Sequence, residues 1–195
     1  MTRISGADRR QQIIEAAHAV ILEKGLAQAA TRDVTRRLGV GSGLLHHYFK
    51  SWQTLRAEAV RHSVESEIAQ LQQTLDRTPP PQWIELLVDW MTADGDLHHW
   101  SLWLNAVDEA RRDTELAEVV RAAYIQWQQV VIRIIDRLVE DGIGHRPGTP
   151  AAAGRLCALV DGLAGAVFLG EQVMTPQTAK SILRDQIKLD LGLSS

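Results

Sequence analysis

The sequence predicts an all-α protein made of two helical domains, and three observations lead to this prediction. Apolar residues recur with the spacing of a helix face along most of the chain. From residue 51 onward no segment combines strict apolar–polar alternation with the β-branched enrichment of a strand. Glycines and Thr-Pro pairs stand where helices are expected to end and begin. A chain of 195 residues that is 45% apolar can bury one small and one medium core, which we place in residues 1–56 and 57–195.

The first predicted helix spans residues 9–24 and ends at Gly25, since glycine commonly terminates helices. Helical spacing gathers its apolar residues on one face, namely Ile13, Ala16, Ala17, Val20 and Ile21. This helix supplies the third element that a small three-helix domain needs to close its core.

Two short helices folded around a glycine turn are predicted within residues 31–49. Thr31 can cap the first helix, Gly39 ends it, and Gly41 or Ser42 opens the second. The apolar positions of both helices converge on one core: Val34, Leu38, Leu45 and Phe49. Such a pair of helices with a tight turn is the helix-turn-helix pattern, whose second helix enters a DNA groove. An ordinary helical hairpin has the same spacing.

Charge is divided unevenly between the two predicted domains. Residues 1–56 hold nine Lys and Arg against four Asp and Glu, a net charge of +5, whereas the whole chain carries −3. An acidic protein with one basic end is expected when attraction to phosphates is confined to that end. Basic residues that simply face solvent would give the same net charge. The uneven division of charge therefore supports a DNA interface only together with the helix-turn-helix pattern.

Residues 9–60 resemble the DNA-binding domain of the tetracycline-repressor (TetR) family of transcriptional regulators. The resemblance runs through the apolar face at 13–17, the Gly25 stop and the ordered segments TRDV, RLGV and G-x-L, and it ends at Phe49. It covers about a quarter of the chain, and its specificity lies in the ordered spacing. The HHYF segment is closer to the subgroup of the choline-responsive betaine regulator. The segments WSLWLNAVDEARRD and RLCALVDGLAG carry weaker similarity to the C-terminal domain of that subgroup.

Four positions depart from the pattern of the family. Thr35 stands where a small alanine is frequent, and Gly41 stands where a capping serine is frequent. His46 replaces a tyrosine that commonly contacts phosphate, and Trp52 replaces the lysine that usually opens the fourth helix. The loss of two phosphate contacts changes the expected DNA footprint and leaves the identity of the domain intact.

The resemblance implies that residues 42–48 form a recognition helix that enters the major groove. The residues expected to face base edges are Ser42, Gly43, Leu44 and His47, with Leu44 able to touch a thymine methyl group. The residues expected to hold phosphates and set the register are Thr31, Arg32, His46 and Lys50.

The second domain is predicted to begin with a long helix that Ser51 caps and that runs to about residue 75. The proline-rich segment 78–81 breaks the chain before a helix over residues 82–91. A turn at residues 94–96 precedes a further helix over residues 97–110.

The last three predicted helices have clear start signals. Asp113 caps a long helix that ends at residues 142–147 and has the apolar stripe Leu116, Val120, Tyr124, Trp127, Val131, Ile134 and Leu138. Thr149-Pro150 and Thr175-Pro176 each place a capping threonine before a proline at the first helical position.

Small residues recur every four positions along the helix that follows Pro150, at Gly154, Ala158, Gly162, Ala166 and Gly170. Such a stripe lets another helix approach closely, either within one subunit or across an interface. The resemblance implies the second arrangement, because members of the family dimerise through a four-helix bundle built from their last two long helices. A homodimer also suits a helix-turn-helix protein that binds the two halves of a palindrome.

Five of the six tryptophans lie in the second domain. Tryptophans at helical spacing usually belong to a core, although indoles on several helices also line cavities. The resemblance implies that a small molecule enters this domain and changes the spacing of the DNA-binding domains. Aromatic faces with acids nearby suit a lipophilic or cationic ligand. The residues expected to bind it are Trp90, His99, Trp100, Trp103 and Trp127.

Neither a metal nor a cofactor is predicted. Asp94, Asp96, His98 and His99 suggest a metal site, but adjacent histidines on a helix point about 100° apart and do not converge on one ion. The single cysteine, Cys157, cannot form an internal disulfide and is expected to be a buried, inert thiol.

We therefore expect a cytoplasmic, ligand-responsive regulator that represses transcription from a palindromic operator and that has no membrane segment. Two other classes stay open. A helical protein-interaction module could use the small-residue stripe without binding DNA. An all-α enzyme could use His98 and His99, although no nucleophile–base pair or phosphate-binding glycine loop is evident.

Overall fold

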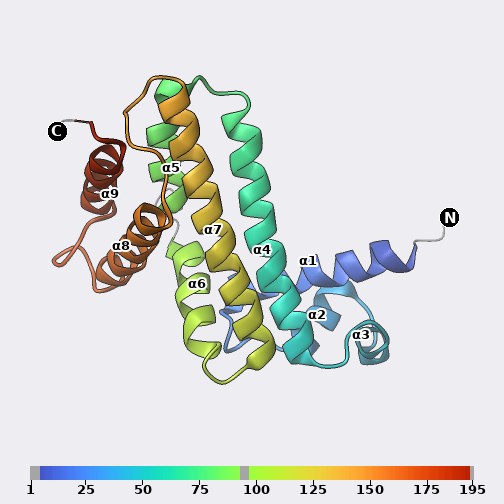
Figure 1. Cartoon of the computed structure of the whole chain (residues 1–195). Helices are drawn as coiled ribbons and strands as arrows, with labels where there is room; N and C mark the ends of the chain where they lie inside the picture. The colour runs from blue at the N-terminus through green and yellow to red at the C-terminus, as the bar shows by residue number, and fades with distance from the viewer. Residues whose placement is uncertain (1–4, 93–96, 194–195) are drawn as a thin grey trace. The chain divides into compact units, whose positions relative to one another are not determined.

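The computed structural model describes residues 5–92 and 97–193, and for residues 97–99 it describes the backbone alone. These described residues form helices joined by turns and loops and include no strand, so the predicted all-α class is confirmed (Figure 1). The helices are α1 (Gly6–Lys24), α2 (Thr31–Leu38), α3 (Ser42–Tyr48), α4 (Trp52–Leu75), α5 (Trp83–Met91), α6 (Leu97–Glu109), α7 (Thr114–Glu140), α8 (Pro150–Phe168) and α9 (Pro176–Leu191). A 3-10 turn at Pro80–Gln82 precedes α5.

Contacts divide the chain into two compact units that are not simple halves of the sequence. Unit 1 consists of Met1–Glu67 and Ser101–Ala123, and unit 2 consists of Ile68–Trp100 and Tyr124–Ser195. Helices α4, α6 and α7 therefore each have residues in both units. The domain boundary that the sequence suggests, between residues 56 and 57, stays a prediction.

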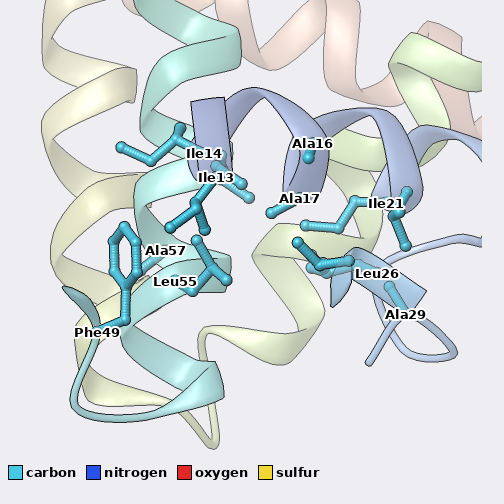
Figure 2. Close-up of a cluster of buried hydrophobic side chains, with 14 of the residues drawn as sticks. Ile13, Ile14, Ala16, Ala17, Ile21, Leu26, Ala29, Phe49, Leu55 and Ala57 are labelled. Atoms are coloured by element: carbon cyan, nitrogen blue, oxygen red, sulfur yellow. The ribbon is translucent and has the colours of Figure 1, made fainter. Parts of the chain in front are cut away.

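Unit 1 is built on the apolar face of α1. Its predicted face is buried, and the side chain of Ser5 caps the helix by accepting a hydrogen bond from the Asp8 amide. Figure 2 shows Ile13 of α1 with Phe49 and Leu55 at one end of the cluster, and Leu26 near Ile21 at the other end. Gly25 ends α1 with φ 82°, a conformation that glycine adopts without a steric penalty.

The start of α2 differs from the prediction that Thr31 caps it. Thr31 is already the first helical residue, and the capping position is Ala30, which has no side-chain acceptor. The Asp33 carboxylate instead accepts a hydrogen bond from the Ala30 amide at 3.2 Å and another from Lys24 Nζ at 2.6 Å. The Lys24 hydrogen bond lowers the pKa of Asp33, so this carboxylate is charged at neutral pH. Asp33 thus joins the end of α1 to the start of α2.

The turn between α2 and α3 has the predicted form. Gly39 is left-handed at φ 65°, and Gly41 is the capping residue of α3. Leu45 and Phe49 of the α3 segment are 2% and 4% exposed, as their predicted core roles require. Ser51 caps α4 by accepting a hydrogen bond from the Thr54 amide at 3.0 Å, as predicted.

The end of α6 and the start of α7 belong to the same apolar cluster as α1–α3. They contribute four buried residues, which are Leu102, Ala106, Leu116 and Val119. The Asp113 carboxylate caps α7 as predicted, since its Oδ1 accepts a hydrogen bond from the Leu116 amide at 3.1 Å. The helices that surround the helix-turn-helix pair therefore include segments far along the chain.

Unit 2 contains α5, α8 and α9. Thr149 and Thr175 cap the last two helices, as predicted, by accepting hydrogen bonds from the Ala152 and Thr178 amides. By length and composition α8 could cross a membrane, but the core helices of soluble proteins meet the same criteria. Seven α8 residues are buried, namely Ala152, Ala153, Leu156, Cys157, Leu163, Ala164 and Val167.

Ion pairs join α5 to α9 across the surface of unit 2. Arg184 donates to both carboxylate oxygens of Glu85, at 2.6 and 2.7 Å, and Lys180 Nζ lies 2.8 Å from Asp89 Oδ1. The paired hydrogen bonds from Arg184 lower the pKa of Glu85, because they favour its charged form. These pairs fix α9 along α5, beyond what apolar packing alone would specify.

The loop between α7 and α8 holds the end of α9. The backbone amides of His145 and Arg146 both donate to the Leu191 carbonyl, at 2.9 and 3.2 Å. Gly148 donates its amide to Asp136 Oδ1 at 2.7 Å and approaches the backbone of Ile132 closely. A Cβ atom on Gly148 would lie 2.6 Å from the Ile132 carbonyl oxygen, so this position requires glycine.

We expect Gly148→Ala to lower the free energy of unfolding by about 2 kcal/mol, because the new methyl group meets rigid backbone atoms. Urea titration followed by far-UV circular dichroism measures this change. Gly43→Ala is the matched control, since its Cβ would meet nothing within 4 Å. That substitution within α3 should be neutral or stabilising, and equal losses in both variants would contradict the close approach at Gly148.

Candidate functional site

Helix α3 separates its side chains cleanly into an apolar and a solvent-facing set. Leu45 is buried, whereas Leu44 is half-buried beside it. Four predicted base-contacting or phosphate-contacting residues are exposed on this helix, namely Ser42, Gly43, His46 and His47. A polar, exposed face on a helix held from behind by core residues is the geometry that major-groove recognition needs.

The remaining predicted phosphate ligands come from the two segments that flank α3. Arg32 in the first turn of α2 and Lys50 just after α3 are exposed, and Thr31 is half-buried. Thr31 of α2 and His46 of α3 line the same small depression, together with Ser51. The fold thus brings Thr31 and His46, which are fifteen positions apart in sequence, to one place on the surface.

Several basic residues of unit 1 are engaged in contacts within the protein. The Arg10 guanidinium lies 4.9 Å from the centre of the Phe49 ring and 3.4 Å from Glu58 Oε1. Arg37 pairs with Glu23 at 2.5 Å, and Lys24 pairs with Asp33. Because these partners lie 9 to 48 positions apart in sequence, no local pattern identified them. Counting charges along the sequence therefore overstates how many cations are available to DNA.

The predicted effector residues do not all belong to one unit. Trp90, Trp100 and Trp127 are in unit 2, whereas Trp103 is in unit 1. Trp100 is buried, and its indole Nε1 donates to the Met91 carbonyl at 3.4 Å, which is a core contact between α6 and α5. Trp90, Trp103 and Trp127 are half-buried, and the side chain of His99 lies outside the described residues.

A second group of polar residues in unit 2 was not among the predicted ligands. Burial and the nearby Asp161 carboxylate raise the pKa of Tyr124, and the same two causes raise the pKa of the Cys157 thiol to about 12. Cys157 is therefore protonated and buried, as predicted, while Asp161 brings negative charge close to the Tyr124 ring. The available sequence signal was that Asp161 is the one acidic residue within α8.

The small-residue stripe on α8 faces outward over much of its length. Ala158 and Gly162 are exposed and Gly154 and Ala166 are half-buried, but Gly170 lies beyond the end of the helix, at φ 102°. The prediction of five residues along one helix is wrong in that last member. Large apolar side chains are exposed on α8, α9 and their connection, namely Phe168, Leu169, Val173, Ile182 and Leu189.

The described part of the chain contains no group of three or more His, Cys, Asp or Glu residues arranged to hold a metal ion. Asp94 and Asp96, and the side chains of His98 and His99, lie outside it.

Comparison with known proteins agrees with this arrangement over nearly the whole chain. A family model described as "BetI-type transcriptional repressor, C-terminal" matches residues 80–191, and one described as "Bacterial regulatory proteins, tetR family" matches residues 13–59. The regulator PksA of Bacillus subtilis is 24% identical over 189 residues, which cover 95% of this chain and 91% of that protein. The regulator BetI of Proteus mirabilis is 27% identical over 195 residues, which cover 95% and 92% of the two proteins.

A solved structure from Saccharomonospora viridis in complex with choline has the same fold. Its TM-score is 0.78 at 24% identity, and the match covers 93% of this chain and 96% of that chain. These findings favour a regulator over an interaction module or an enzyme. Because the BetI-type model alone spans more than half of the sequence, this chain belongs to the TetR family of transcriptional regulators, with a C-terminal domain of the BetI type.

Proposed function

We propose that this regulator is a cytoplasmic homodimer that represses transcription from a palindromic operator and is released by a small cationic molecule. The observation that carries the proposal is the exposed polar face of α3, which Leu45 and Phe49 anchor from behind. The acidic remainder of the chain confines phosphate attraction to the same end of the sequence.

DNA recognition is divided between two sets of residues. The base edges are contacted by Ser42, Gly43, Leu44 and His47, which lie in the first two turns of α3. The phosphates are contacted by Thr31, Arg32, His46 and Lys50. The shared depression lined by Thr31 and His46 supports a common phosphate position for these two residues.

The effector is a small organic cation bound in the BetI-type domain. Support comes from the half-buried tryptophans of unit 2, Trp90 and Trp127, and from the negative charge that Asp161 brings near Tyr124. Aromatic faces and a carboxylate are the groups that hold quaternary ammonium ions. The structure from Saccharomonospora viridis contains choline, which makes choline the first probe to use. The sequence also predicts that Trp100, Trp103 and His99 contact the effector.

Dimerisation uses the exposed faces of α8 and α9. Within the protomer, a Cβ atom on Gly162 would meet nothing within 4 Å, so a partner helix can approach the α8 backbone there. The exposed apolar residues of α9 and of the segment after α8, such as Ile182 and Leu169, supply surface that a second copy buries. The effector then shifts the dimer toward a state whose two recognition helices no longer match the operator spacing.

The proposal is tested by selecting bound fragments of the encoding genome with the purified protein, followed by fluorescence anisotropy at two salt concentrations. One palindromic site bound by a dimer supports it. Weak binding that is indifferent to sequence, with or without added choline, would contradict it and favour an interaction module.

On the selected site, Lys50→Ala should weaken binding to all sequences about equally and reduce the salt slope by about one, because one phosphate contact is lost. His47→Ala should relax base preference and leave that slope unchanged. Lys50→Arg is the matched control and keeps the wild-type slope. A change in sequence preference from Lys50→Ala would show that the two roles are assigned incorrectly.

Gly162→Leu should convert the dimer into a monomer, because its side chain fills the space that a partner helix needs. Analytical ultracentrifugation measures the mass, and circular dichroism checks that the helices persist. Ala151→Leu, at an exposed position in the first turn of α8, is the control and should remain dimeric. An unchanged dimer in both variants would exclude this face as the interface.

Choline chloride should raise the melting temperature of the wild-type protein, since it binds the folded state. Asp161→Asn should abolish the shift by removing the negative charge beside Tyr124. Glu171→Gln, at an exposed position after α8, should keep the shift, and sodium chloride at the same concentration controls for ionic strength. A shift of equal size in the Asp161 variant would remove this residue from the site.

A further inference from the structure

Arg56 in the second turn of α4 makes a buried ion pair with the corner between α6 and α7. Its Nη2 lies 2.5 Å from Asp113 Oδ2, and its Nη1 lies 3.4 Å from Glu109 Oε2. The Arg56 side chain is 11% exposed and that of Asp113 is 7% exposed. A charge-assisted pair this well covered is screened little by salt, unlike the ion pairs on the surface of the protein.

Asp113 performs two tasks with its two oxygens. Oδ2 pairs with Arg56, while Oδ1 accepts the Leu116 amide and caps α7. Burial raises the pKa of this carboxyl, but the hydrogen bonds from Arg56 and from the α7 amides outweigh that effect and lower it overall. The group is therefore charged at neutral pH and ties the start of α7 to the start of α4.

The pair borders a polar niche of about 260 Å³, which is also lined by Gln53, Arg112, Thr114 and Glu115. Water in such a niche can solvate the charged groups if they separate. Opening the pair therefore leaves no dry cavity, and the contact can be lost while the apolar core of unit 1 stays intact.

The start of α4 is closely connected to the recognition helix. Three residues separate the end of α3 from the start of α4, and among them Phe49 is buried in the core while Ser51 caps α4. A connection this short and this well anchored makes the orientation of α3 depend on that of the first turns of α4. Helices α4, α6 and α7 all continue into unit 2, where the proposed effector site lies.

We propose that Arg56 and Asp113 are positioning residues for DNA recognition, acting through helix α4; this inference rests on the proposed function. Their ion pair holds the start of α4, and with it α3, in one orientation against the corner of α6 and α7. A dimer that must place two recognition helices at once loses affinity when either is free to vary, because binding then has to restrict that motion.

Asp113→Asn tests the proposal, because asparagine keeps an oxygen for capping α7 and removes the charge opposite Arg56. Arg112→Gln is the matched control, since Arg112 lines the same niche but its pair with Asp108 at 3.3 Å is 68% and 61% exposed. Arg56→Lys, which keeps the charge and loses the second hydrogen-bonding arm, should give an intermediate effect.

Two readouts are taken on the full-length protein. The first is the affinity for the selected operator at two salt concentrations, with the active fraction determined by stoichiometric titration. The second is hydrogen exchange of residues 52–62 in the protein without DNA. We expect Asp113→Asn to weaken operator binding at least about fivefold at an unchanged salt slope, and to speed exchange in this segment. Arg112→Gln should change neither.

Wild-type affinity together with wild-type exchange in Asp113→Asn would overturn the proposal. A smaller active fraction with an unchanged dissociation constant would also overturn it, because the pair would then support stability alone. A salt slope reduced by about one in Arg56→Gln, which removes the charge, would overturn it as well, since Arg56 would then be a phosphate ligand. If the wild-type protein binds no operator, the proposed function fails, and the exchange data still decide whether the pair holds α4.

Discussion

A helix of seven residues is too short to be stable in water by itself, and α3 of this protein has that length. Its shape depends on burying Leu45 and the adjoining Phe49 in the cluster formed by α1, the start of α4 and the corner of α6 and α7. Full burial of such side chains contributes roughly 1.5 to 3 kcal/mol each, which offsets part of the entropy lost when a short helix is ordered. The exposed polar face of α3 exists because its other face is held in this way.

The pairing of charged side chains in unit 1 also depends on this apolar cluster. Lys24, Arg37 and Arg56 pair with acids on other segments and so connect elements that the apolar cluster brings together. The cations on or beside the helix-turn-helix pair, such as Arg32 and Lys50, are exposed, and these are the ones that we propose contact DNA. In the proposed function the paired and the exposed basic residues differ in role, because the first connect helices and the second attract phosphates.

Unit 2 is closely packed, yet a single protomer exposes several large apolar side chains on the surface of this unit. The ion pairs between α5 and α9 and the loop over Leu191 fix the position of α9, which displays Ile182 and Leu189 to solvent. Orientation and exposure of this kind suit association with a second copy. The same unit holds Asp161 near Tyr124, so the proposed effector and dimer regions share helix α8.

The sequence by itself determined the all-α class, most helix ends and the buried faces of α1–α3, because caps, glycine stops and helical periodicity are local signals. It also identified the exposed residues of α3, because they lie on the face of the helix opposite the buried Leu45 and Phe49. Only the tertiary structure showed that Asp33, which accepts the Ala30 amide at the start of α2, also pairs with Lys24 at the end of α1. It alone joined Arg56 to Asp113, and it alone brought residues of α6 and α7 into the core behind the helix-turn-helix pair. The Arg56–Asp113 pair links residues 57 positions apart, and the choice among many distant partners is made by packing the whole chain rather than by any local pattern.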